Sequence, residues 1–167
     1  MRKLLNTAML LFAVLMTACT APDTWELVSK DNNIRFVLEN REEKGEANLS
    51  YSVYYKDTVA VEKSLLGLMM DNCEYGKAAQ FVSASTVKDI HDAYQLKSGK
   101  KLSTADECRE QTFTFRSKEG KQFNLIVRAY SDGIAFRYGF PEADGQMHTI
   151  QTEHTEFAVP VNGKASL

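Results

Sequence analysis

The sequence contains little of several residue types that mark specialised protein classes. Three cysteines in 167 residues are too few for a disulfide scaffold. The formal net charge is −2 and no basic stripe is visible, so we expect no nucleic-acid partner. The sequence also lacks the CxxC and HxxH spacings of metal sites, the G-x-S-x-G elbow of serine hydrolases, and phosphate or dinucleotide fingerprints. What remains is an ordinary globular composition, 44% hydrophobic and 25% charged, over a length that suits one domain or part of one.

The first residues have the pattern of an export signal. Arg2 and Lys3 precede the short apolar run LLNTAMLLFAVLM, and the small-residue stretch LMTAC follows it, ending at Cys19. This stretch resembles the lipobox of bacterial lipoproteins, which implies a signal peptide at 1–18, lipidation of Cys19 and a tether at 19–25. An ordinary signal peptide with an incidental Cys19 is the alternative. Either way we expect export, and with lipidation we expect an anchor in the cell envelope, in the outer membrane or facing the periplasm.

Two other cysteines, Cys73 and Cys108, remain after export. An exported protein lies in a compartment that permits disulfides. A bridge would close a loop of about 35 residues and stabilise the fold by roughly 3–4 kcal/mol in the chain-entropy model. Two buried free thiols are the equal alternative.

Alternation of apolar and polar residues predicts strands through most of the remaining chain. NIRFVLEN places Ile34, Phe36 and Leu38 on one face, and NLSYSVYYK does the same from Leu49 to Tyr55. The polar stretch REEKGEA between them predicts a hairpin loop. DTVAVEKS and LLGLMMD indicate a further short pair, and DNCEYGKAAQ a loop.

The second half of the chain contains the clearest meander. QTFTFRS, QFNLIVRAY and IAFRYGF alternate strongly and are separated by the turns KEGK and SDG. Before them, FVSASTVKDI indicates one weak strand, and HDAYQLKSGKKLSTADECRE a polar, irregular region. After them, MHTIQTEHTEFAV indicates a last strand. We expect no helix after residue 19.

Turns that recur every 8–12 residues favour an all-β fold, an antiparallel β-sandwich or barrel. We assign residues 26–167 to one such domain. The chain stops at VPVNGKASL without a polar tail. We therefore expect an incomplete sandwich with an unpaired sheet edge.

No residue of the sequence stands out as catalytic or metal-binding. His91 is followed directly by Asp92, whereas a catalytic histidine needs a partner across space. His148, His154 and Glu156 would share one strand face, a weak argument for a metal. The 22 acidic residues offer many carboxylate pairs, and no spacing singles one out as a glycosidase pair. The tyrosines and Trp25 could stack on sugar rings, although strands use aromatic residues mostly for packing.

The stretch RAYSDGIAFRYGF is similar to a signature in the N-terminal domain of glycoside hydrolase family 97. YYKDTVAVEKSLLGLMM and TEHTEF resemble further stretches of that domain, and together the resemblance covers most of residues 26–160. Within the signature, Asp132 and Gly133 suit the turn, and Phe136 and Tyr138 should face the core. Arg128 and Arg137 should share the opposite face, where they could pair with carboxylates or do so at a domain boundary. The signature residues are Arg128, Tyr130, Asp132, Gly133, Phe136, Arg137 and Tyr138.

The resemblance implies a galactose mutarotase-like β-supersandwich that packs on a catalytic (β/α)8 barrel. Family members hydrolyse α-glucosides or α-galactosides and use calcium, held by the barrel with a glutamate from the later sandwich. No catalytic or calcium residue can be carried onto this sequence, so we expect no cofactor in this chain and no activity of the fragment alone. The implied partners are an α-linked oligosaccharide, the C-terminal barrel and, through lipid, a membrane. A stand-alone surface glycan-binding lipoprotein and a purely structural sandwich are the alternatives.

Overall fold

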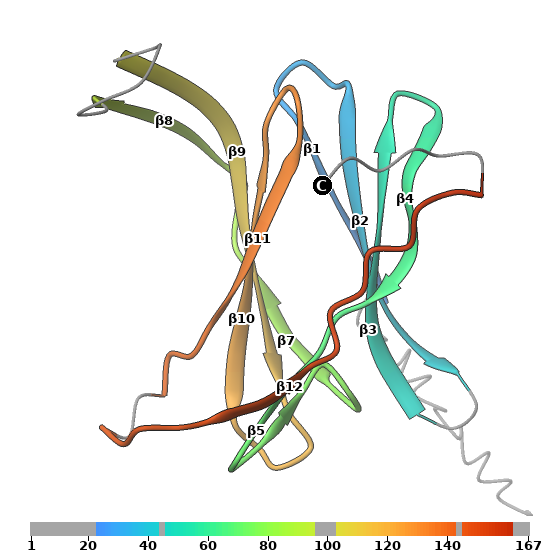
Figure 1. Cartoon of the computed structure of the whole chain (residues 1–167), viewed down its shortest axis with the longest axis vertical. Coiled ribbons are helices and arrows are strands. Elements are labelled where there is room, and N and C mark those ends of the chain that lie inside the picture. Colours follow the sequence, from blue (N-terminus) through green and yellow to red (C-terminus); the bar gives the residue numbers. More distant parts are fainter. Residues whose placement is uncertain (1–22, 44–45, 96–102, 143–144, 162–167) are drawn as a thin grey trace, which may run out of the picture.

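The computed structural model describes residues 23–43, 46–95, 103–142 and 145–161. These residues form strands and turns and contain no helix (Figure 1). The predicted signal peptide and Cys19 lie outside the described residues. In the described part of the chain, no helix is long and apolar enough to span a membrane.

The first sheet is an antiparallel meander of four strands in the order β1-β2-β3-β4. Its strands are β1 (Thr24–Val28), β2 (Ile34–Glu43), β3 (Glu46–Tyr55) and β4 (Thr58–Leu65). The alternation read from the sequence is confirmed, because Ile34, Phe36 and Leu38 are all buried. The predicted loop REEKGEA is largely strand, since β2 and β3 stay paired as far as Glu43 and Glu46.

The second sheet has the order β11-β10-β9-β7, with β8 also paired to β9. It consists of β7 (Gln80–Ala84), β8 (Lys88–Gln95), β9 (Ser103–Arg116), β10 (Gln122–Ala129) and β11 (Ile134–Gly139). The prediction of one weak strand at 81–90 was wrong, because β7 ends at Ala84 and β8 begins at Lys88. The prediction of an irregular region over 91–110 was also wrong: β8 and the first half of β9 form a hairpin there.

A small third sheet, in the order β12-β5-β6, lies at one end of the molecule (Figure 1). It contains β5 (Leu68–Met70), β6 (Glu74–Tyr75) and β12 (Ile150–Glu153). The sequence predicted that DTVAVEKS and LLGLMMD pair with each other, and this was wrong. The first stretch forms β4, which pairs with β3, whereas the second contains β5, which pairs with β6 and β12. The predicted last strand is shorter than its sequence pattern suggests.

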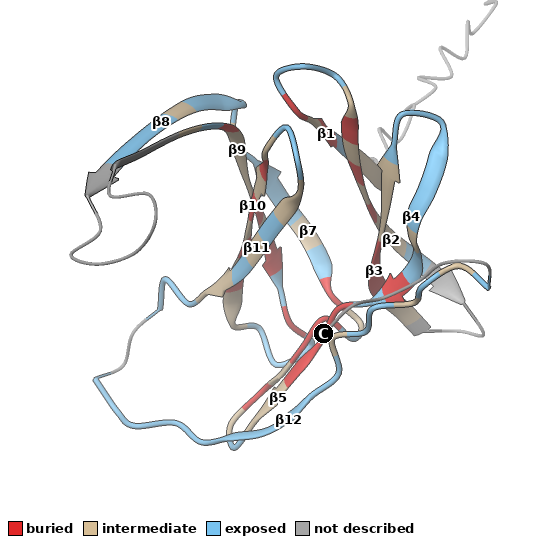
Figure 2. Ribbon diagram, turned by 45° about the horizontal axis from the view of Figure 1, so that its top comes forward, coloured by how far each residue is buried: buried red, intermediate tan, exposed pale blue. Residues whose placement is uncertain are grey.

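The core lies where the first and second sheets face each other (Figure 2). Phe36, Leu38, Leu49 and Tyr51 come from the first sheet. The second sheet supplies Phe113, Phe115, Phe123, Leu125 and Val127, all fully buried. Strand β10 alternates strictly between buried and half-buried residues, as a strand with one face on a core should.

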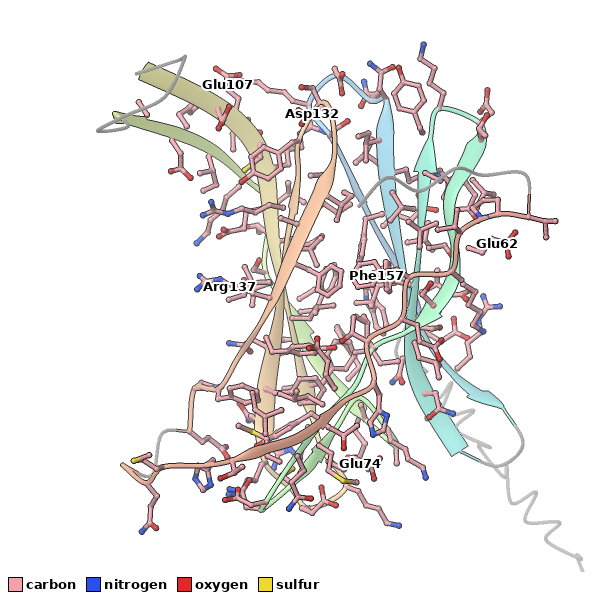
Figure 3. The ribbon with its side chains drawn as sticks, in the orientation of Figure 1. Glu62, Glu74, Glu107, Asp132, Arg137 and Phe157 are labelled. Carbon is pink, nitrogen blue, oxygen red and sulfur yellow. The ribbon has the colours of Figure 1, made fainter. Side chains whose placement is uncertain are left out.

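The segment after β12 crosses the open side of the sandwich. The Tyr51 hydroxyl donates to the Glu156 carbonyl at 2.8 Å, and the Glu62 N–H donates to the Ala158 carbonyl at 2.8 Å. Phe157 stacks on Phe136 with ring centroids 6.3 Å apart, yet 67% of it stays exposed. Figure 3 shows Phe157 between the two sheets. This segment therefore covers part of the edge of β4 and leaves apolar surface in solvent.

Candidate functional site

The signature hairpin consists of β10 and β11, joined by a tight turn at Ser131–Gly133. The Tyr130 N–H donates to the Gly133 carbonyl at 2.9 Å, and Ala129 pairs with Ile134. Asp132 lies at the tip of the hairpin (Figure 3). The turn contains no residue with positive φ, so Gly133 is not needed there for a left-handed backbone.

The inner face of the hairpin holds the sandwich together. As predicted, Phe136 and Tyr138 face the core with Ile134. The Phe136 ring meets Tyr51 of the first sheet edge-on at 5.2 Å. The Tyr138 hydroxyl lies 3.0 Å from Thr155 Oγ1, and burial raises the pKa of Tyr138. Phe136 therefore packs the second sheet against the first, and Tyr138 links the second sheet to the segment after β12.

The outer face carries both arginines, but only Arg128 is engaged in the described residues. Arg128 Nε donates to Glu110 Oε2 at 2.7 Å, and its Nη1 donates to Asp92 Oδ2 at 2.8 Å. The hydrogen bond with Glu110 raises the pKa of Arg128 above its ordinary value. Arg128 thus ties three strands together, and the sequence alone could not name its partners because they lie on β8 and β9, in the region read as irregular.

Arg137 is exposed and has no hydrogen-bond or ion-pair partner among the described residues. It points away from the sandwich on the outer side of β11 (Figure 3). With Ile126, Tyr130 and Ala135 it lines an open hollow of about 400 Å³. The expected pairing of Arg137 with a carboxylate therefore does not occur within the described part of the chain.

Cys73 and Cys108 are both buried free thiols, so the disulfide that the sequence left open is not formed. Cys73 Sγ lies 3.0 Å from Ser117 Oγ, just beyond the end of β9. Cys108 lies far up the same strand, on the order of 30 Å from Ser117 at about 3.3 Å per extended residue. A bridge needs Cα atoms within about 7 Å. Burial raises the pKa of both thiols, which makes them unreactive at neutral pH.

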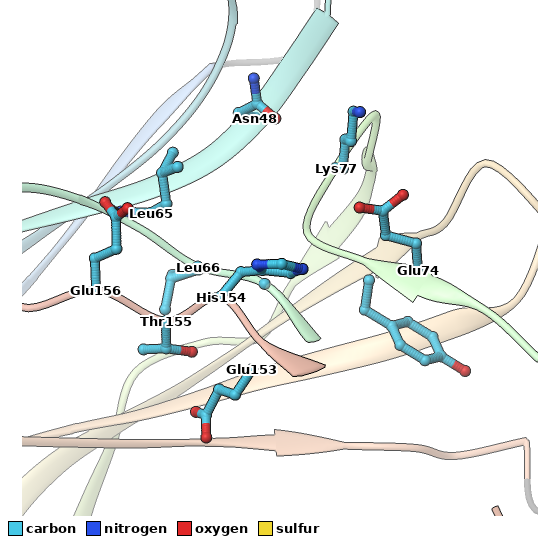
Figure 4. A pocket seen from close by; sticks show the side chains of 11 residues that line it. Asn48, Leu65, Leu66, Glu74, Lys77, Glu153, His154, Thr155 and Glu156 are labelled. Atoms are coloured by element: carbon cyan, nitrogen blue, oxygen red, sulfur yellow. Dashed lines mark hydrogen bonds between the residues drawn. The ribbon is translucent and has the colours of Figure 1, made fainter. Parts of the chain in front are cut away.

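A hollow of about 490 Å³ lies between the third sheet and the segment after β12. Figure 4 shows Glu74 and Lys77 on one side of it and Glu153 and His154 on the other. The Glu156 carboxylate accepts from the Leu65 N–H at 3.2 Å. The Glu156 side chain is thus bound to the edge of β4. The hollow is a polar space where segments of the fold meet.

The other titratable groups noted in the sequence lie apart from one another. His91 Nδ1 lies 3.0 Å from Glu107 Oε1 at the surface. His148 lies beside Asp71, while His154 lines the large hollow. Among the described residues no three histidine, cysteine or acidic side chains gather closely enough to hold a metal ion. These residues do not fit the calcium site that the resemblance implies.

Comparison with known families accounts for this arrangement. Residues 27–167 match the family model described as "Glycosyl-hydrolase 97 N-terminal". The chain belongs to this family. The matched residues include the signature hairpin and nearly all of the sandwich.

Known relatives are much longer than this chain. A "Probable retaining alpha-galactosidase" of Streptomyces bingchenggensis (strain BCW-1) is 28% identical over 107 residues, which cover 64% of this chain and 16% of that protein. A glycoside hydrolase family 97 enzyme of Pseudoalteromonas sp. strain K8, solved with panose, gives a TM-score of 0.70 at 24% identity. The match covers 81% of this chain and 20% of that enzyme. A β-arabinopyranosidase gives a TM-score of 0.73 at 25% identity, over 81% of this chain and 21% of that one. The predicted all-β sandwich is confirmed, and the chain spans about a fifth or less of these relatives.

Proposed function

We propose that this chain is the N-terminal sandwich module of an exported α-glycoside hydrolase and does not cleave glycosides by itself. The observation that carries the proposal is the family match over residues 27–167, set beside relatives of which the chain covers about a fifth. Glycoside hydrolysis needs two carboxyl groups about 5–10 Å apart across one bond. A catalytic (β/α)8 barrel of about 250 residues would have to supply them.

The contacts of five described carboxylates support a scaffolding role. Glu110 and Asp92 are bound to Arg128, and Glu107 to Lys30. Glu156 accepts from a backbone N–H, as Asp71 does from Thr149. Such pairs hold strands in place, whereas a general acid must keep its proton for the leaving group.

Arg137 supplies the contact that such a module needs with a neighbouring domain. Its guanidinium stands exposed on the outer face of the signature hairpin, in a hollow that also exposes Tyr130. An arginine fork recognises a carboxylate through two parallel hydrogen bonds. We place the catalytic barrel against this face, with a barrel carboxylate as the partner of Arg137.

The experiment is a hydrolysis assay of the purified 167-residue protein on 4-nitrophenyl α-glucoside and α-galactoside, with and without calcium. We expect no release of nitrophenol above the buffer rate in any condition. Turnover that survives repeated purification and disappears on unfolding would contradict the proposal, because it would place a complete catalytic site within these residues.

The anchor is a second part of the proposal and rests on the sequence at Cys19. Lipidation there would hold the sandwich in the cell envelope, since several acyl chains anchor stably where one does not. Metabolic labelling with a radioactive fatty acid should mark the wild-type protein and not Cys19→Ser. Equal labelling of both proteins would reject lipidation at this residue.

A further inference from the structure

A second, smaller cavity lies beside the end of the signature hairpin. Its volume is about 230 Å³, and it opens between the end of β11, the start of β10, the β5–β6 hairpin and residues 145–148. Met70, Tyr75 and Phe140 supply apolar walls. Asn72, Gln122 and His148 supply polar groups. Apolar walls with a few placed polar groups are typical of small-molecule sites.

Phe140 gives this cavity an aromatic wall that is both accessible and fixed. Alternation along β11 would bury Phe140 with Phe136 and Tyr138, yet it is 39% exposed. Its ring centroid lies 4.9 Å from that of Tyr75, which in turn lies 5.3 Å from that of Phe123 in the core. The ring is therefore held in position before any ligand arrives, so binding against it costs little conformational entropy.

A chain of hydrogen bonds fixes the polar side of the cavity. His148 Nδ1 lies 3.0 Å from Asp71 Oδ1, which favours the tautomer with the proton on Nδ1. Nε2 then accepts from Asn72 Nδ2 at 3.3 Å. Asp71 is held in turn by the Thr149 N–H at 3.2 Å. Each group in this chain orients the next.

The chain of hydrogen bonds ends in an unmatched acceptor. Asn72 Oδ1 is covered and has no hydrogen-bond partner among the described residues. A buried acceptor left unpaired destabilises the structure. Because Asn72 lines the cavity, a ligand hydroxyl that enters it is the kind of donor that this oxygen lacks.

We propose that this cavity binds one hexopyranose ring of an α-linked oligosaccharide. The ring stacks its C–H face on Phe140, and its hydroxyls hydrogen-bond the side-chain amides of Asn72 and Gln122. Pockets for drug-sized ligands are about 300–1,000 Å³, so 230 Å³ suits a single sugar ring. The choice of a sugar rests on the proposed function, while the existence of a site rests on the cavity itself. This role makes the module a binder of the substrate chain as well as a scaffold.

The test is a titration of the purified protein with maltose and with melibiose, followed by calorimetry and by saturation-transfer NMR. For one ring we expect a dissociation constant on the order of 1 mM. Phe140→Leu removes the flat face but keeps the apolar volume, and should weaken binding about tenfold. Phe140→Trp keeps an aromatic face and should retain binding. Sorbitol, which has hydroxyls and no ring, should not bind.

Tyr55→Leu is the matched control, because Tyr55 is another exposed aromatic residue, on the first sheet and outside this cavity. It should leave the affinity unchanged, and all variants should keep the melting temperature near that of the wild type. No binding by the wild type, or full binding by Phe140→Leu, overturns the proposal. Hydrolysis of maltose during the titration would instead overturn the non-catalytic function and leave the cavity assignment standing.

Discussion

Strand β9 passes through two regions that are stabilised in different ways. Its second half carries Phe113 and Phe115 into the core, where both are fully buried. Its first half pairs with β8 in an arm. Most of the described side chains of this arm are charged and lie at the surface, although Cys108 is buried. One strand therefore shows what apolar burial contributes and what a backbone ladder with surface ion pairs contributes.

The ladder of the arm places opposite charges together at some positions and like charges at another. Lys88 stands opposite Glu110, and Asp89 opposite Arg109, but Asp92 stands opposite Asp106. Like charges directly opposite each other destabilise a sheet. Arg128 of the signature hairpin binds Asp92 from the next strand and offsets this repulsion. Among the described residues, Lys30 also binds Glu107, and Arg109 donates to the carbonyls of Val28 and Ser29. A few polar contacts thus hold the arm to the sandwich, whereas apolar burial holds the core.

Removing a core ring should have the largest effect. Phe115 packs against Trp25, Phe81 and Phe123. Phe115→Ala should lower the free energy of unfolding by about 3–5 kcal/mol, through lost burial and the cavity left behind. Val87→Ala, at an exposed residue before β8, should change it by less than about 0.5 kcal/mol. Urea denaturation measures both, and equal losses would refute the division between core and arm.

Alkaline pH should have the next largest effect, again in the core. Burial raises the pKa of Tyr51 to about 12 from its ordinary 10.0. The unfolded state therefore releases this proton first, so stability is complete below pH 10 and falls as the pH rises toward 12. The loss amounts to about 2–3 kcal/mol at 1.36 kcal/mol per unit of pKa.

Tyr51→Phe isolates this contribution. This substitution should lower the free energy of unfolding by about 1 kcal/mol at neutral pH, because the hydrogen bond to the Glu156 carbonyl is lost. Above pH 10 its stability should fall less steeply than that of the wild type. Parallel curves of unfolding free energy against pH for the two proteins would show that Tyr51 is not the group responsible.

Releasing the arm should have a smaller effect. Arg128→Ala should lower the free energy of unfolding by about 1 kcal/mol, because Asp92 loses its partner. For the same reason it should speed amide hydrogen exchange in β8. Arg137→Ala is the matched control on the same face. It should change neither the free energy of unfolding nor the exchange rate in β8. Slow exchange in β8 of Arg128→Ala would mean that the backbone ladder and the remaining polar contacts hold the arm without Arg128.

The smallest effect should come from the ion pair between the arm and the turn that joins β1 and β2. Lys30 Nζ lies 2.6 Å from Glu107 Oε2, but both side chains are largely exposed. The hydrogen bond to Lys30 lowers the pKa of Glu107, yet water and salt screen such a surface pair. Lys30→Met should leave the melting temperature unchanged within error, and a clear drop would mark this pair as structural.

The same comparison explains how much the sequence predicts. Strands β2, β3, β10 and β11 follow from alternation, because one face is apolar and the other polar. The arm could not be predicted in this way. In β8 and at the start of β9 both faces carry polar residues, so apolar and polar residues do not alternate regularly. The pairing of β5 with β12 also escaped prediction, because short strands far apart in sequence leave no local signal.

Some features of the candidate site follow from the sequence, and others do not. The inward placement of Phe136 and Tyr138 and the outward placement of Arg128 follow from their positions in the strands. The partners of Arg128, the exposure of Phe140 and the link between Asp71 and His148 depend on segments that meet only in the folded chain. The cavity beside Phe140 could not be read from any single stretch.

The most direct test of the account is the size of the native protein in the cells that make it. Cell envelopes are blotted with an antibody raised against the sandwich. The account predicts a band larger than the 18.8 kDa of this chain by at least a barrel of about 250 residues. A band only at or just below 18.8 kDa would contradict it, because the sandwich would then act without a catalytic domain attached.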